Sequence, residues 1–328
     1  MKIQLLHKFE DIISVDNLLS AWQEFIRGKR NKYDVQEFSL CLMDNIFNLH
    51  EELAHHTYCH GPYQFFNISD PKPRNIHKAT MRDRLLHRAI YRILYPLFDK
   101  TFMADSYSCR KNKGTHKALD RFRYFAGRAS HNHTRTCFVL KCDIKKFFAN
   151  IDQDILIRIL GRHIGDFEIL ALIKEIISSF HTTKLGIGLP LGNLTSQLLV
   201  NIYMHEFDVY MKQELRVKYY LRYADDFVIL SDSEEYLKIL ISRIKFFLEQ
   251  KLHLNLHENK VYIKTYASGV DFLGWIHFPH YRQLRTSTKR KILRNTRYFP
   301  RPQTINSYRG LLSHGNAHKL YARIKECR

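Results

Sequence analysis

The sequence predicts an α+β fold, because helical and strand-type segments are interspersed along a chain of 328 residues. Apolar residues recur at helical spacing in the first sixty residues and in two later segments. Residues 138–143 are a short run of strand formers, and residues 218–231 have the pattern of a strand, a turn and a second strand. No repeat or linker is visible, and this order of elements taken alone fits either an α+β or an α/β protein.

The N-terminal part is expected to be helical. Asp16 is placed to cap a first helix. The apolar stripe of that helix consists of Leu18, Leu19, Trp22, Phe25 and Ile26. A second helix is predicted around the stripe Phe38, Leu42, Ile46 and Leu49. Pro62, Pro71 and Pro73 then interrupt the helical pattern and indicate extended chain.

Further helices are predicted downstream. Asp83–Phe98 carries apolar residues on one stripe, and helical periodicity returns at 152–180. Pro190 and Gly192 are turn residues that precede another helix, which continues through 197–211. The strand predicted at 138–143 lies between these helical segments and ends on an acid, Asp143.

The composition indicates a folded protein with a polyanionic partner. With 45% apolar residues the chain can bury a core, so global disorder is excluded. The net charge is +20, which favours nucleic acid first and an anionic membrane surface second. Charged residues appear too early for a secretory signal, and no apolar run reaches a membrane span. Six cysteines without paired spacing are typical of reduced thiols, so a cytoplasmic location is expected.

The positive charge is concentrated in two stretches. Residues 272–325 contain twelve Lys or Arg and no acid. A run within this stretch consists of Arg282, Arg285, Lys289, Arg290, Lys291, Arg294, Arg297 and Arg301. Residues 110–135 form a second basic stretch in which Asp120 is the only acid. Two basic arms around an acid-containing middle suit a protein that grips a phosphate backbone from both sides.

Three carboxylates in the middle segment are the candidate catalytic residues. Asp143 ends one apolar strand, and the adjacent Asp225 and Asp226 lie between two strand-type runs. Adjacent acids in an apolar hairpin resist desolvation and repel each other, unless a divalent cation neutralises them. Carboxylate oxygens suit Mg²⁺. If the two strands are neighbours in one sheet, the acids can hold two Mg²⁺ ions.

Tyr223-Ala224-Asp225-Asp226 resembles the Y-x-D-D signature of reverse transcriptases. The other motifs, before and after it, occur along the chain in the order of that family. The resemblance implies a right-hand polymerase, with N-terminal helices and fingers at 1–137, an antiparallel palm at 138–280 and a short helical, basic thumb at 281–328. A fingers-like helical insertion is expected near 153–185. It also implies two Mg²⁺ ions, which activate a primer 3′-hydroxyl and stabilise the leaving pyrophosphate.

The resemblance assigns roles to further residues. The metal site would comprise Asp143, Ile144, Asp225 and Asp226, and Phe148 would exclude a ribose 2′-hydroxyl. The other expected dNTP contacts are Lys72, Arg74, Arg110, Leu189, Gly192, Gln197 and Lys260, with Lys260 as proton donor to pyrophosphate. The expected primer grip is Phe272, Leu273, Gly274 and Trp275. Seven cations of the thumb would hold the RNA/DNA template–primer duplex: Arg282, Arg285, Lys289, Arg290, Lys291, Arg294 and Arg297.

The segment Leu189-Pro190-Leu191-Gly192-Asn193-Leu194-Thr195-Ser196-Gln197 closely resembles the enzymes of diversity-generating retroelements. The short basic end agrees with that branch. Such enzymes copy a template-repeat RNA into cDNA with errors at template adenines, and they work with a small, basic, oligomeric accessory protein. A bacterial or phage-encoded, cytoplasmic protein with no membrane partner is implied.

The sequence is also compatible with other functions. A retron or group II intron reverse transcriptase shares the Y-A-D-D motif, and an untemplated polymerase of the abortive-infection type is poorly separated by sequence. A non-enzymatic RNA-binding scaffold on a polymerase fold is disfavoured by the intact set Asp143, Asp225 and Asp226. An RNA-dependent RNA polymerase is disfavoured by Phe148 in the gate position.

Overall fold

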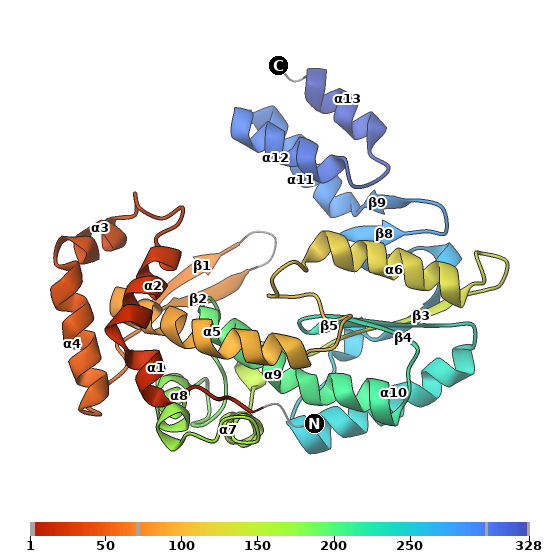
Figure 1. Cartoon of the computed structure of the whole chain (residues 1–328). Helices are drawn as coiled ribbons and strands as arrows, with labels where there is room; N and C mark the ends of the chain where they lie inside the picture. The colour runs from red at the N-terminus through yellow and green to blue at the C-terminus, as the bar shows by residue number, and fades with distance from the viewer. Residues whose placement is uncertain (1–3, 70–72, 299–300, 327–328) are drawn as a thin grey trace. The chain divides into compact units, whose positions relative to one another are not determined.

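The computed structural model describes residues 4–69, 73–298 and 301–326 of the chain (Figure 1). The chain forms two compact units, each assembled from three stretches of sequence. The first, here called the helical unit, comprises Met1–Met103, Ile144–Tyr210 and Phe247–Asn255. The second, the sheet unit, comprises Ala104–Asp143, Met211–Phe246 and Leu256–Arg328. The mixed helix and sheet fold predicted from the sequence is confirmed; the boundaries of fingers, palm and thumb stay a prediction.

The helical unit is built around one long helix, α5 (Met81–Thr101), which packs against α2 and α9. Thr80 caps α5, because its hydroxyl oxygen accepts a hydrogen bond from the Asp83 main-chain N–H. The other helices of this unit are α1 (Phe9–Ile13), α2 (Val15–Phe25), α3 (Tyr33–Leu40), α4 (Leu42–Ala54), η1 (Phe147–Asn150, 3₁₀), α7 (Gln153–Leu160), α8 (Phe167–Ser178) and α9 (Leu194–Val209). An antiparallel hairpin joins β1 (Gln64–Ile68) to β2 (Arg74–Lys78).

Two expectations for the N-terminal helices were wrong in detail. Ser14, and not Asp16, caps α2, because its side chain accepts the Asn17 N–H and leaves Asp16 in the first turn. The single helix expected around 38–49 is broken at Cys41, whose φ of −119° and ψ of 45° are not helical. The helical segment predicted at 152–180 is likewise two helices, each with an aspartate cap, Asp152 for α7 and Asp166 for α8.

The sheet unit contains a four-stranded antiparallel sheet in the order β4-β5-β3-β6. Its strands are β3 (Phe138–Asp143), β4 (Tyr219–Tyr223), β5 (Asp226–Ser231) and β6 (Tyr262–Thr265). Helix α6 (Thr115–Ala129) packs on β4 and β5 (Figure 1). Its Phe122 is fully buried. Truncation of such a buried ring costs about 3–5 kcal/mol of stability. Because the strands are antiparallel, the end of β3 lies beside the start of β5. The three candidate acids lie at these strand ends, which form one edge of the sheet.

The rest of the sheet unit follows β6. A three-stranded antiparallel sheet consists of β7 (Val270–Phe272), β8 (Trp275–His277) and β9 (Arg282–Leu284). Three C-terminal helices are α11 (Thr286–Tyr298), α12 (Pro302–Leu312) and α13 (His318–Glu326). Shorter elements are η2 (Tyr210–Glu214, a π-helix), η3 (Glu258–Lys260) and η4 (Tyr266–Ser268). Helix α10 (Glu234–Leu252) begins in the sheet unit and ends in the helical unit. Among the described residues, no helix is long and apolar enough to cross a membrane.

Candidate active site and nucleic-acid interface

The three candidate acids lie together at one edge of the four-stranded sheet. Asp143 is the last residue of β3 and is the register partner of Asp226, the first residue of β5. Tyr223, the last residue of β4, also pairs with Asp226, so Ala224 and Asp225 alone form the turn between the strands. Ala224 adopts a left-handed φ of 56°, which is uncommon for a residue with a side chain. The strands expected to be neighbours are therefore neighbours, and they bring Asp143 to the Asp225-Asp226 turn.

Burial and mutual repulsion perturb this acidic group. Burial raises the pKa of Asp225 to about 6, and the negative charges of Asp226 and Asp143 act in the same direction. Two ammonium groups partly offset this charge. Lys260 Nζ donates a hydrogen bond of 2.7 Å to Asp143 Oδ1, and Lys141 Nζ lies 3.5 Å from Asp226 Oδ1. The acids thus form a concentrated negative site that already attracts cations of this chain.

The donor chemistry of the site fits a divalent cation. Carboxylate oxygens are the ligands that Mg²⁺ prefers. The Ile144 side chain is a hydrocarbon without a ligand atom, so only its main-chain carbonyl is suited to join them. In the described part of the chain, however, no three His, Cys, Asp or Glu side chains converge as metal ligands do. Lys260 and Lys141 lie against two of the carboxylates instead, and a cation would have to compete with them.

Arg222 belongs to the same site and was not found by sequence reasoning. It lies in β4, one residue before Tyr223, and its side chain is fully buried. Its guanidinium donates a 3.2 Å hydrogen bond to the Ala224 carbonyl, inside the acidic turn. Its main chain pairs with 105–107: Arg222 N donates to the Asp105 carbonyl, and Tyr107 N donates to the Arg222 carbonyl, each at 3.0 Å. The only signal in the sequence was an Arg between strand-forming residues, and the structure shows that its side chain is buried and hydrogen-bonded to the turn.

Several residues expected at the nucleotide lie together within the helical unit. The Phe148 ring is half-buried and meets the buried Phe147 edge-on at 5.6 Å. The Leu189 N–H donates to the Phe148 carbonyl at 2.8 Å, and the Leu189 side chain is only 2% exposed. Leu189 therefore supports the backbone of Phe148, whereas Phe148 presents part of its ring to solvent.

The loop around Gly192 is fixed to strand β2. His77 N donates to the Leu191 carbonyl at 2.9 Å, and Asn193 Nδ2 donates to the His77 carbonyl at 3.0 Å. Gly192 has a φ of 117°, and a Cβ there would lie 2.7 Å from Ile76 Cγ2. Only glycine satisfies both conditions without a shift of the strand. The close contact between Gly192 and Ile76 holds the loop alongside the strand that begins at Arg74.

The remaining expected nucleotide contacts are more scattered. Arg74 is exposed on β2, and Gln197 is half-buried in the first turn of α9. Lys72 lies outside the described residues. Arg110 belongs to the sheet unit, where its guanidinium donates to the Ser106 carbonyl at 3.0 Å. The expected nucleotide contacts are thus divided between the two units.

The expected primer grip is a tight hairpin turn in the sheet unit. Phe272 ends β7 and pairs with Trp275, the first residue of β8. Leu273 and Gly274 form the turn with φ values of 48° and 88°, as a two-residue hairpin turn of type I′ requires at both positions. Phe272 and Trp275 are both buried. The motif therefore forms a rigid corner whose exposed part is the turn itself.

The expected thumb cations fall into three groups. Arg282 lies 3.3 Å from Asp120 and bonds the His314 carbonyl, while Arg285 bonds Asp271 at 2.6 Å. These two cations are engaged within the protein. The exposed cations of α11 are Arg290, Arg294 and Arg297, whose spacing places them on one helix face. Lys289 and Lys291 on the same helix are half-buried. The stripe on α11 is the strongest candidate duplex contact.

The chain matches the model of a known protein family. A profile of the family described as "Reverse transcriptase (RNA-dependent DNA polymerase)" matches residues 69–277. The matched region contains all three acids, the loop around Gly192 and the turn predicted to be the primer grip. The chain belongs to the reverse transcriptase family.

Several relatives of this reverse transcriptase are encoded within introns. The chain is similar to the group II intron-encoded protein LtrA of Lactococcus lactis subsp. cremoris, with 24% identity over 71% of this chain and 49% of LtrA. It is 25% identical to the protein YkfC of Escherichia coli over 63% of each chain. A putative COX1/OXI3 intron 1 protein of Saccharomyces cerevisiae is 27% identical over 52% of this chain and 20% of that protein. The chain thus spans less than two thirds of each of these relatives.

Proposed function

We propose that this chain is an RNA-directed DNA polymerase, which extends a primer on an RNA template from dNTPs. The observation that carries the proposal is the register pairing of Asp143 with Asp226 beside the Asp225 turn. A sheet edge with three acids is suited to nucleotidyl transfer with divalent cations. In the proposed right hand, fingers span 1–137, the palm 138–280 and the thumb 281–328.

The residues of the site have distinct proposed roles. Asp143, Asp225, Asp226 and the Ile144 carbonyl would hold two Mg²⁺ ions, which lower the pKa of a primer hydroxyl and stabilise pyrophosphate when bound. The primer 3′-oxygen attacks the α-phosphorus of the dNTP, and the bond to pyrophosphate breaks. Lys260 is the proposed proton donor to the leaving pyrophosphate, because its ammonium group already lies at Asp143.

Primer extension on an RNA template tests this proposal. Asp225→Asn should lower extension by roughly a hundredfold or more, since metal catalysis supplies several kcal/mol, while RNA binding is retained. Asp154→Asn is the matched control, because Asp154 is exposed in the first turn of α7. Extension by Asp225→Asn at the rate of the unsubstituted chain would exclude the proposal.

Phe148 is the proposed sugar gate. Its half-exposed ring, next to the buried Phe147, is available to a nucleotide and is not only a core residue. Phe148→Ala should raise ribonucleotide incorporation by roughly tenfold to a hundredfold, the discrimination an apolar pocket achieves against an added hydroxyl. Unchanged selectivity between dNTPs and rNTPs in competition assays would count against the gate.

We further propose that the chain serves a diversity-generating retroelement, with a template-repeat RNA and a small basic accessory protein as partners. The Leu189–Gln197 segment supports this branch. Its hydrogen bonds to His77 of β2 hold it beside the strand that begins at Arg74, and we propose that errors opposite template adenine arise there. Apolar side chains such as Leu191 cannot check base geometry through hydrogen bonds. Sequencing of cDNA made by Arg74→Ala and Leu189→Met tests the route. If neither change alters the error rate opposite adenine, the route is wrong.

A group II intron function is the second candidate, because LtrA is a group II intron-encoded protein. The two candidates predict different products. The retroelement enzyme should misincorporate mainly opposite template adenines, whereas an intron-type enzyme should show no such bias. The error spectrum of cDNA copied from one defined RNA separates them.

A further inference from the structure

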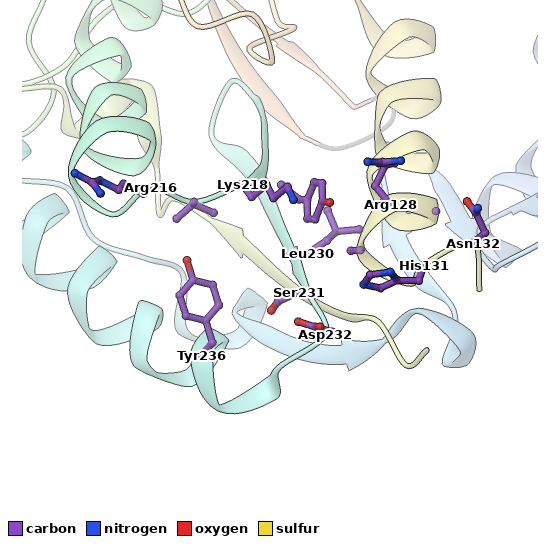
Figure 2. A pocket seen from close by; sticks show the side chains of 13 residues that line it. Arg128, His131, Asn132, Arg216, Lys218, Leu230, Ser231, Asp232 and Tyr236 are labelled. Atoms are coloured by element: carbon purple, nitrogen blue, oxygen red, sulfur yellow. The ribbon is translucent and has the colours of Figure 1, made fainter. Parts of the chain in front are cut away.

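A second site lies at the opposite end of the strands that carry the acids. A pocket of about 650 Å³ is lined by Gly127, Arg128, Ala129, His131, Asn132, Arg216, Val217, Lys218, Tyr219, Leu230, Ser231, Asp232 and Tyr236 (Figure 2). Strand β5 runs from Asp226 at the acidic edge to Ser231 in this pocket. Five residues of strand span about 16 Å, so a ligand here cannot share the atoms of the acidic site.

The pocket carries excess positive charge. Arg128 comes from the last turn of α6, and Arg216 and Lys218 precede β4; the three cations against the single acid Asp232 leave +2 with His131 neutral. Figure 2 shows Arg128 and His131 on one side, Arg216 and Lys218 on the other, and Ser231 and Asp232 between them. All three cations are exposed. Within the described part of the chain, no acid forms an ion pair with Arg128 or Arg216, so the phosphate groups of a ligand are their natural partners.

Arg128 is not needed to complete the end of α6. The Gly127 carbonyl accepts the Asn132 N–H at 2.7 Å, and the Ala126 carbonyl accepts the Ser130 N–H at 3.0 Å. The loop therefore satisfies these carbonyls with its own main chain. The position of Arg128 is fixed by the helix, and these two carbonyls do not need its guanidinium as a hydrogen-bond donor.

The pocket also offers an aromatic surface. Tyr236 lies in the first turn of α10, is 37% exposed and lines the pocket opposite Arg128 of α6 (Figure 2). Exposed aromatic rings beside cations are typical of single-stranded nucleic acid sites, where bases stack and phosphates meet Lys or Arg. The other tyrosine, Tyr219, is already in contact with Lys218, whose ammonium lies 5.3 Å from the ring centre. Tyr236 is thus the available stacking surface.

Asp232 gives the pocket a hydrogen-bond acceptor, which favours RNA over a ligand that offers only anionic groups. A carboxylate beside the cations repels phosphate, but it accepts hydrogen bonds from a ribose 2′-hydroxyl or a base amino group. We propose that this pocket binds single-stranded RNA outside the segment being copied. Phosphates lie at Arg128, Arg216 and Lys218, a base stacks on Tyr236, and Asp232 contacts ribose or base. RNA binding in this pocket does not depend on polymerase activity.

Binding of a fluorescent oligouridylate to the full chain tests the proposal, with a chain-terminated template–primer occupying the acidic site. The triple variant Arg128→Gln/Arg216→Gln/Lys218→Gln should lower the slope of log affinity against log salt by about 2, at roughly 0.7 per contact. Tyr236→Ala should weaken binding by at least about fivefold, as loss of one stacked base does. Extension of a short template–primer should stay within about twofold of the unsubstituted chain for both variants.

A charge-matched control uses Arg27→Gln/Arg30→Gln/Lys174→Gln, three exposed cations that do not line the pocket. An equal loss of oligouridylate binding in this control would overturn the proposal, since net charge would then explain the effect. If the triple variant at Arg128, Arg216 and Lys218 loses binding to polyglutamate but keeps its binding to oligouridylate, the proposal is overturned in favour of an acidic protein partner. Equal affinity for oligothymidylate would overturn the contact of Asp232 with ribose.

Discussion

The Lys260 ammonium group donates a 2.7 Å hydrogen bond to the carboxylate of Asp143. A cation that binds Asp143 must compete with this ammonium for the same carboxylate. Lys260→Met should therefore lower the Mg²⁺ concentration for half-maximal primer extension by about three- to tenfold, through loss of a nearby positive charge. The maximal rate should fall at the same time, because the proposed proton donor is lost. A magnesium titration of primer extension measures both effects.

Lys264→Met is the control for this experiment. Lys264 is exposed on β6 and lies over the Tyr262 ring, 5.2 Å from its centre, and not against an acid. Its substitution should leave the magnesium titration unchanged. If Lys260→Met and Lys264→Met behave alike, the contact between Lys260 and Asp143 has no bearing on metal binding.

The raised pKa of Asp225 predicts a pH-dependent stability. The folded chain holds this proton with a pKa of about 6, against 3.8 for an ordinary Asp. The stabilising contribution is therefore fully present below about pH 4 and is lost as the pH rises through 6. Asp225→Asn should raise the free energy of unfolding at pH 8 in EDTA by up to about 3 kcal/mol, and should change it little at pH 4. Urea denaturation at both pH values tests this, and an equal difference at both would contradict it.

Gly315 is predicted to fix the position of the buried Trp275. A Cβ at Gly315 would lie 2.1 Å from Trp275 Cζ3, so Gly315→Ala must displace the ring or the loop. Overpacking of this kind should cost about 1–3 kcal/mol and weaken extension from a template–primer. Gly310→Ala is the matched control: it lies within α12, where a Cβ meets nothing within 4 Å, and it should be neutral or stabilising by up to about 1 kcal/mol. Equal thermal stability of the two variants would refute the role of Gly315.

The exposed stripe on α11 should govern duplex binding. Arg290→Gln/Arg294→Gln/Arg297→Gln removes three candidate phosphate contacts from one helix face. The slope of log affinity against log salt for an RNA/DNA duplex should fall by about 2.7, at roughly 0.9 per contact. Fluorescence anisotropy over a salt series measures the slope. The Arg27→Gln/Arg30→Gln/Lys174→Gln control should keep the original slope; if it does not, the stripe is not the duplex contact.

The strands were predictable because their residues favour one structure locally. The run at 138–143 is β3 with the same bounds, and 218–231 contains β4, the acidic turn and β5. The helix boundaries were less predictable: Ser14 and Asp16 are both good caps, and in the structure Ser14 caps the helix. The break at Cys41 has no strong local marker in the sequence.

The parts of the candidate site that depend on tertiary contacts could not be read from the sequence. Arg282 and Arg285 belong to the same basic run as Arg290, yet the acids Asp120 and Asp271 engage them. Arg222 has the charge of a surface residue, but packing of α6 and residues 105–107 on β4 buries it. Such partners are distant or ambiguous in sequence, so spacing alone cannot identify them.

Sequencing of products made on two RNA templates of different sequence tests whether the chain is an RNA-directed DNA polymerase. Each template should be annealed to the same DNA primer and incubated with the unsubstituted chain, Mg²⁺ and all four dNTPs. An RNA-directed DNA polymerase should make DNA complementary to the template in each case, and Asp225→Asn should lose that product. Products whose sequence does not depend on the RNA supplied would contradict it.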